Sequence, residues 1–85
     1  GFFMREFVLQ IYYQGEMIEL REFKQAGYQP DKGDEIYLTF ENDNYSKEYG
    51  NWWQVKKRKF LLPRTDSSME VLQLFCEPCE PSDNW

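Results

Sequence analysis

The residue types that most enzymes and metal sites rely on are scarce in this sequence. The chain has no histidine, and histidine is both the commonest general base and the commonest metal ligand. Its absence excludes Ser-His-Asp catalysis, Cys-His catalysis and histidine-containing zinc motifs within one chain. Neither a P-loop nor a Gly-x-Gly-x-x-Gly motif occurs. We therefore expect a protein that is not an enzyme and needs no cofactor.

The two cysteines form the one site-like motif, Cys76-Glu77-Pro78-Cys79. A redox pair would need a helix N-terminus to lower the thiol pKa, and the short, proline-containing tail cannot supply that helix. Structural zinc needs four ligands, so these thiols would require a second chain or oxygen atoms from Glu77 and Glu80. A thiol or metal site at Cys76 and Cys79 is therefore the weakest of three hypotheses. We expect Cys76 to pack as a small hydrophobic residue and Cys79 to be an exposed thiol.

A basic stretch at residues 52–64 is the part of this acidic chain where positive charge is concentrated. It holds five Lys or Arg residues and no acid, whereas the whole chain has a net charge of −5. The stretch could contact phosphates, with Trp52 or Tyr49 stacking on bases, or it could meet an acidic protein face. It could also be a solvated strand whose lysines discourage edge-to-edge pairing. The net negative charge repels polyanions, so nucleic acid is the alternative partner and protein the preferred one.

Two adjacent tryptophans begin this stretch, and on a strand they must point in opposite directions. Trp53 has the same parity as Val55, so we expect Trp53 in the core and Trp52 at least partly exposed beside Tyr49. Exposed tryptophan is enriched at binding hot spots. With the basic residues, these positions give the candidate partner-binding residues, which are Tyr49, Trp52, Lys56, Lys57, Arg58 and Lys59.

Apolar patterning predicts five strands in this chain of 85 residues, which is the size of one small domain. The strands are expected at residues 7–13, 17–24, 34–40, 52–62 and 69–77, with loops at 25–33 and 41–51 and a loose tail at about 78–85. Gln14-Gly15 suits a tight turn, so the second segment is expected to pair back on the first. A helix at about 16–26 is the alternative, because this segment is rich in good helix formers.

The fourth predicted strand contains a conflict of alternation. Trp53 and Val55 share one parity, whereas Phe60 and Leu62 share the other, so a regular strand cannot point all four side chains at one core. One extra residue within the 56–59 stretch would reconcile the two halves, which is what a β-bulge does. We therefore predict a bulge in this strand and a core that receives both pairs of side chains.

A pattern of short motifs extends over about residues 30–76. It reads Pro30-x-x-Gly33-Asp34-x-Ile36-x-Leu38, a polar loop, Trp53-x-Val55-x-x-Arg58-x-Phe60, a turn, and Val71-x-x-Leu74. This pattern resembles that of many small SH3-like β-barrel domains. The resemblance implies a fold and assigns no functional residue. With the strand pattern, it predicts an all-β domain over residues 1–85, either a five-stranded SH3-like barrel or a strongly bent antiparallel sheet, with an α+β fold carrying the helix at about 16–26 as the alternative.

These observations favour a non-enzymatic protein-binding or assembly module whose partner is another protein or a second copy of this chain. A nucleic-acid-binding accessory domain that uses residues 52–64 is the alternative. The chain has no apolar run of about 18 residues, so we expect no membrane association, and it shows no signal-peptide pattern. With so few cysteines, reduced thiols and a cytoplasmic location are expected.

Overall fold

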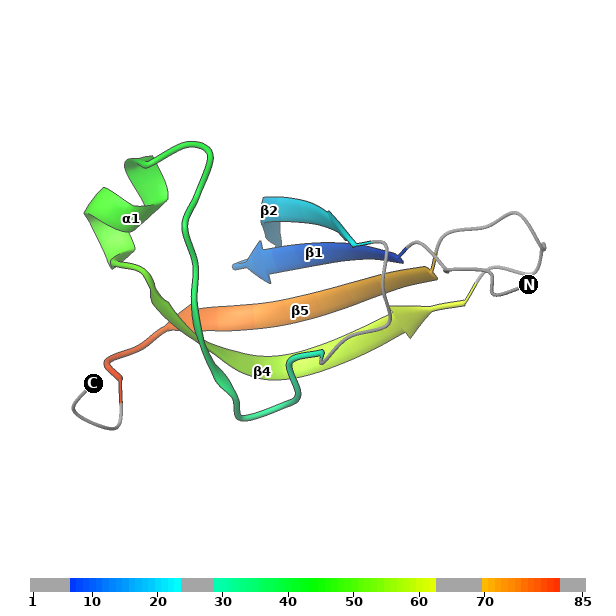
Figure 1. The fold of residues 1–85 in the computed structure, drawn as a ribbon. Helices are drawn as coiled ribbons and strands as arrows, with labels where there is room; N and C mark the ends of the chain where they lie inside the picture. The colour runs from blue at the N-terminus through cyan, green and yellow to red at the C-terminus, as the bar shows by residue number, and fades with distance from the viewer. Residues whose placement is uncertain (1–6, 24–28, 63–69, 82–85) are drawn as a thin grey trace.

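The computed structural model describes residues 7–23, 29–62 and 70–81, and within them the chain forms one curled sheet and one short helix (Figure 1). The strands are arranged in the order β2-β1-β5-β4-β3. The sheet curls like half of a small barrel, which gives it a concave inner face and a convex outer face. In chain order the elements are β1 (Phe7–Tyr13), β2 (Glu16–Phe23), β3 (Glu35–Tyr37), α1 (Asn44–Tyr49), β4 (Trp52–Leu61) and β5 (Glu70–Pro78).

The five-stranded, strongly bent sheet that the sequence predicted is confirmed, and it is mixed where an antiparallel sheet was expected. β1 pairs with β5 in parallel, with Leu9 opposite Leu72 and Ile11 opposite Leu74. The other neighbouring strands pair antiparallel. A parallel pair needs a long crossover connection, and here the chain from β2 to β4 provides it. The first and last strands therefore lie side by side at the centre of the sheet.

β1 and β2 form the predicted hairpin, so within the described residues the alternative helix at 16–26 is wrong. Glu16–Phe23 is a strand that runs antiparallel to β1, and residues 24–26 lie outside the described ranges. Gln14 and Gly15 both have positive φ, 52° and 82°. Positive φ at both central residues is the geometry of a tight hairpin turn whose twist matches that of the strands.

The third predicted strand and the loop after it differ from expectation. β3 is shorter than predicted and ends at Tyr37. Leu38 and Asn51, the next pair in the same register, stay in contact: the Leu38 N–H donates to the Asn51 carbonyl at 2.8 Å, and the Asn51 side chain donates to the Leu38 carbonyl at 2.7 Å. The region expected to be an exposed loop contains α1. Tyr45 and Tyr49 are four residues apart, so they share one side of this helix, and both pack against the core.

The core lies on the inner face and is centred on Trp53. Trp53 and Val55 are fully buried, as the sequence predicted. The rings of Tyr13, Phe40 and Tyr49 meet the indole of Trp53 edge-on, with centroid distances of 5.3, 5.8 and 5.9 Å, an arrangement that aromatic quadrupoles favour. Alternate residues of β1 and β5 complete the core with Leu9, Ile11, Leu72, Leu74 and Cys76.

The segment after β3 covers this core from the inner side. Leu38 is buried with the core residues, and Arg21 of β2 donates a hydrogen bond to the Thr39 carbonyl. Figure 1 shows the segment running across the sheet on its way from β3 to α1. The inner face is therefore covered around Trp53. The outer face is formed by the side chains that alternate with these core residues along each strand.

Candidate functional site

β4 carries the bulge that the sequence predicted, and the extra residue is Lys56. Val55 lies opposite Cys76 and Lys57 lies opposite Phe75, so Lys56 has no position of its own in the ladder. A bulge bends its strand and increases the local twist, which fits the curl of the sheet. It also allows two consecutive side chains to share a face, which regular alternation forbids.

The bulge gathers three lysines on the outer face of the sheet. Strict alternation would have separated Lys57 and Lys59 from Lys56. Lys57 and Lys59 lie opposite outer-facing residues of β5, and residues directly opposite each other share a face. Lys56 joins them, because its Nζ atom lies 3.8 Å from a carboxylate oxygen of the outer-facing Glu77. We call Lys56, Lys57 and Lys59 the outer lysine cluster.

A ladder of aromatic and amide side chains lies beside this cluster. Tyr12 of β1 and Phe75 of β5 stack, with ring centroids 5.2 Å apart and planes inclined by 21°. The Nζ atom of Lys59 lies 5.4 Å from the Phe75 centroid, so Phe75 has a ring on one flank and a cation on the other. Gln10 accepts hydrogen bonds from the Tyr12 hydroxyl at 3.0 Å and from Nε2 of Gln73 at 2.9 Å. These contacts fix the orientation of the stacked rings.

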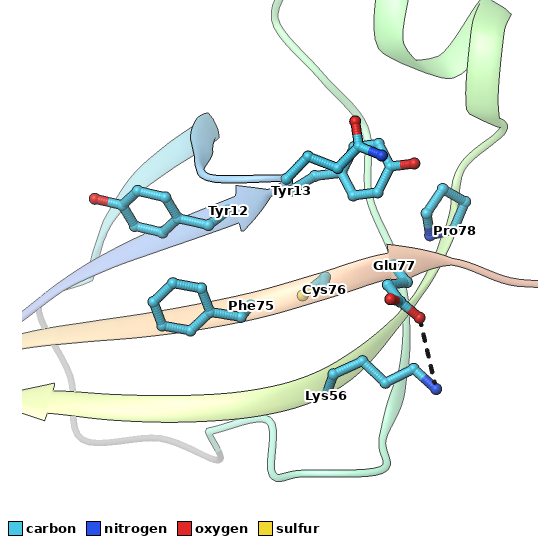
Figure 2. Close-up of a pocket in the computed structure, with 8 residues that line it drawn as sticks. Tyr12, Tyr13, Lys56, Phe75, Cys76, Glu77 and Pro78 are labelled. Atoms are coloured by element: carbon cyan, nitrogen blue, oxygen red, sulfur yellow. Dashed lines mark ion pairs between the residues drawn. The ribbon is translucent and has the colours of Figure 1, made fainter.

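A shallow hollow of about 530 Å³ opens where β1, β5 and the bulge of β4 meet. Figure 2 shows Tyr12 and Phe75 side by side, and Lys56 reaching toward Glu77 from the neighbouring strand. The Lys56–Glu77 pair is exposed on both sides, and such pairs contribute at most about 1 kcal/mol. Another carboxylate could therefore replace Glu77 as the partner of Lys56 at little cost. The hollow is lined by Tyr12, Tyr13, Gln14, Lys56, Phe75, Cys76, Glu77 and Pro78.

Apolar side chains flank the ladder and the lysines. Met17 and Leu20 lie opposite Tyr12 and Gln10, and Leu61 lies on the same face at the end of β4. Each of the three apolar side chains is nearly half exposed. Met17 and Leu20 lie on β2 and Leu61 lies on β4, with β1 and β5 between them, so apolar groups stand on both sides of the aromatic and amide ladder, and methionine adapts well to varied partners. We call this set the outer surface, made of Tyr12, Met17, Leu20, Lys56, Lys57, Lys59, Leu61 and Phe75.

Arg58, which the sequence grouped with the lysines, faces inward. Its Nε atom lies 3.3 Å from Oδ1 of Asp31, and its Nη1 atom donates to the Pro30 carbonyl at 3.1 Å. The guanidinium also lies 5.0 Å from the centroid of the Phe60 ring. Arg58 therefore fastens the turn before β3 to β4, and it stands apart from the outer lysine cluster.

The core does not reach the end of β4, so the prediction that Phe60 and Leu62 are core residues is wrong. The bulge does bring Phe60 to the inner face, opposite Leu72. Its exposed fraction is nevertheless 45%, and Leu62, just past the strand, is 71% exposed. A sheet face becomes core only where a second layer covers it, and the described segment after β3 packs around Trp53, several residues earlier in β4.

The two aromatic candidates from the sequence lie in different surroundings. Tyr49 packs edge-on against Trp53 and against Tyr13, at 5.1 Å from the Tyr13 centroid. Partial burial raises the pKa of the Tyr49 hydroxyl, and a hydrogen bond with Glu48 adds to the shift. Trp52 is half-buried on the outer face, with its ring 5.4 Å from that of Tyr37. The expectation that Trp53 is buried and Trp52 partly exposed is confirmed.

The cysteines are placed for packing. Cys76 is buried in the core, as predicted, whereas Cys79 is partly buried and its N–H donates to the Trp52 carbonyl at 2.9 Å. Burial raises the pKa of the Cys76 thiol to about 12 and raises that of Cys79 as well. The thiolate is the form that attacks disulfides and binds metals, so both sites favour the unreactive thiol. Among the described residues, no group of three or more His, Cys, Asp or Glu is placed to hold a metal ion.

Several residues of the outer surface were not identified from the sequence. Tyr12 and Phe75 alternate with the core residues of β1 and β5, so their outward direction could have been predicted. Their contact could not, because it depends on β1 pairing with β5 across more than 60 residues of sequence.

Within the described ranges no helix is long and apolar enough to cross a membrane. A comparison with protein-family models, curated proteins and solved structures finds no match to this chain.

Proposed function

We propose that this domain is a non-enzymatic protein-binding module whose outer surface binds an acidic segment of a partner protein. The observation that carries the proposal is the bulge at Lys56, because it gathers three lysines on the face that also exposes Met17, Leu20 and Leu61. Apolar contacts would supply the binding energy, and the lysines would select for acidic partners and exclude basic ones.

Nucleic acid is the second candidate, supported by lysines that lie next to aromatic rings on one sheet face. Bases stack on open aromatic faces, but Phe75 lies between Tyr12 and Lys59, which occupy its two flanks. The net charge of −5 opposes both anionic candidates at long range, and it opposes a phosphate backbone, with a charge on every nucleotide, more than an acidic segment in which every second residue is apolar. Aliphatic groups such as Met17 and Leu20 suit a protein partner better than a phosphate backbone. These points favour the protein partner.

Paired charge variants test the proposal. The Lys57→Gln/Lys59→Gln variant removes two charges from the outer surface, and Lys32→Gln/Lys47→Gln removes two exposed charges elsewhere, so both variants have the same net charge. Two fluorescein-labelled probes are used: a peptide of alternating Glu and Val, and a single-stranded oligonucleotide of about 12 nucleotides. Binding of each probe to each variant is measured by fluorescence anisotropy at two salt concentrations. Two surface charge pairs at roughly 0.5–1 kcal/mol each predict about a 5- to 30-fold loss of peptide affinity in the first variant only.

The outcomes separate the two candidates. Peptide binding that weakens in the Lys57/Lys59 variant and stays unchanged in the Lys32/Lys47 variant supports the proposal. Equal weakening in both variants would mean that net charge alone governs binding, which contradicts a specific outer surface. Oligonucleotide binding at micromolar concentration, without peptide binding, would replace the proposal with the nucleic-acid candidate.

A further inference from the structure

β4 has a long edge that no described strand covers. β3 pairs only with the first three residues of β4, and the turn before β3 reaches one position further, where the Gly33 N–H donates to the Val55 carbonyl at 2.8 Å and Asp34 accepts from the Val55 N–H at 2.9 Å. Beyond the bulge, from Lys57 to Leu61, β4 pairs with β5 on one side. On its other side no strand of the described chain is paired with it (Figure 1).

The backbone groups on this edge can be assigned from the register. In an antiparallel ladder, alternate residues direct their N–H and C=O to one neighbour and the intervening residues to the other. Val55 directs its groups away from β5, and the bulge adds one residue before the alternation resumes. Arg58 and Phe60 are therefore the next residues whose backbone groups point to the edge with which no described strand pairs, and at Arg58 the side chain also contacts Pro30 and Asp31. Their side chains face inward, whereas those of Lys57, Lys59 and Leu61 face outward.

We propose that the acidic partner segment binds as an added antiparallel strand on the edge of β4 from Lys57 to Leu61. This inference rests on the proposed function and adds the mode of binding beside Lys57, Lys59 and Leu61. Met17 and Leu20 lie on β2, on the other side of β1 and β5, so a part of the partner outside the added strand would contact them. The added strand would exchange main-chain hydrogen bonds with Arg58 and Phe60. Its outward residues would lie opposite Lys57 and Lys59 and should be acidic, because opposite charges across a strand pair are favourable. Its inward residues would lie beside the half-exposed Phe60 ring and should be apolar.

The charge on this edge argues against a second copy of the chain as the occupant. If two copies paired along the whole uncovered stretch of β4 in antiparallel register, the pairing would be centred on Lys59 and would set it opposite its own equivalent. Like charges directly opposite each other are destabilising, and lysines on edge strands discourage such self-pairing. Arg58 is already paired with Asp31 on the inner side, so the lysines are the charges that an incoming acidic strand would meet.

Backbone methylation of the peptide probe tests the edge directly. In the antiparallel arrangement, the valine N–H groups of an alternating Glu-Val peptide point to β4, whereas the glutamate N–H groups point to solvent. N-methylation of the valines should weaken binding at least about tenfold, because it removes donors to the edge and adds bulk there. N-methylation of the glutamates keeps the same composition and charge and should leave affinity nearly unchanged.

A pair of protein variants provides the matching test on the chain itself. Phe60→Pro removes the N–H that faces the edge with which no described strand pairs. An edge strand tolerates proline at such a position, because the lost N–H does not pair within the sheet. Phe60→Ala removes the ring and keeps the N–H. We expect peptide binding to be weaker in Phe60→Pro than in Phe60→Ala, with folding checked by circular dichroism. If Phe60→Pro does not fold, the methylated peptides decide the question without it.

Each result has one interpretation. Loss of binding on valine methylation alone supports strand addition. Equal affinity for the methylated and unmethylated peptides contradicts strand addition to the edge of β4, and it leaves the proposal that the outer surface binds an acidic segment unaffected. Absence of binding by every acidic peptide overturns the proposed function and the inference together. A dimer in sedimentation experiments that is abolished by Phe60→Pro would replace the acidic partner with a second copy.

Discussion

The largest single contribution to stability that we expect is that of Trp53. Its side chain is fully buried, and three aromatic rings pack against it edge-on. Removing a buried aromatic side chain costs about 3–5 kcal/mol. At roughly 0.05–0.15 kcal/mol per residue, a chain of this length has a total stability of about 4–13 kcal/mol. Trp53→Ala should therefore remove between a quarter and all of the free energy of unfolding.

Trp52→Ala is the matched control, because it deletes the same atoms from the adjacent position. Trp52 is half-buried and meets the ring of Tyr37 at 5.4 Å. An exposed-face aromatic pair and partial burial together predict a loss of only about 1–2 kcal/mol. The difference between the two variants tests the assignment of the inner and outer faces of β4.

Urea unfolding monitored by circular dichroism measures both losses. With a slope near 1 kcal/mol per molar urea for a domain of this size, Trp53→Ala should lower the midpoint by about 3 M or more, and Trp52→Ala by about 1–2 M. If Trp53→Ala is unfolded without urea, Trp53→Phe keeps a ring against Tyr13 and Phe40 and should lie between the wild type and Trp53→Ala. A Trp52→Ala variant that loses as much stability as Trp53→Ala would refute the reasoning.

Three further outcomes are expected. Burial raises the pKa of the Cys76 thiol to about 12 in the folded chain, so the unfolded chain releases this proton at a lower pH, and the free energy of unfolding should fall as the pH rises from about 9 to 12. Urea unfolding across that range should show a shallower decline for Cys76→Ala than for the wild type. Gln14 has a φ of 52°, which asparagine adopts more readily, so Gln14→Asn should raise the melting temperature, and a lower one would contradict the turn geometry. Arg58→Gln removes the contacts with Asp31 and Pro30 and should cost roughly 1 kcal/mol; amide hydrogen exchange of residues 31–34 should accelerate, and unchanged exchange would show that Arg58 does not hold this turn.

Alternation of side chains along the chain was enough to predict much of β4. The parity of Trp53 and Val55 against Phe60 required an extra residue, and the register places it at Lys56. The same argument separated Trp53 from Trp52, and the Gln14-Gly15 pair predicted the first hairpin. These inferences succeeded because side-chain direction on a strand is a local property with a period of two.

The tertiary structure decided which of these faces became core and which became surface. Phe60 has the inward parity but lies where the described chain places no second layer over it, so it stays half exposed. Tyr45 and Tyr49 formed a helix where loop residues were expected, because their shared side packs on the core.

The candidate site also depended on the tertiary structure. The sequence alone located the charge of the outer lysine cluster, and the parity conflict located the bulge that unites it. The stack of Tyr12 on Phe75, which gives the cluster its neighbours, required the parallel pairing of β1 with β5. Strand pairing is set by long-range packing of the whole sheet, and no local pattern in either strand specifies its partner.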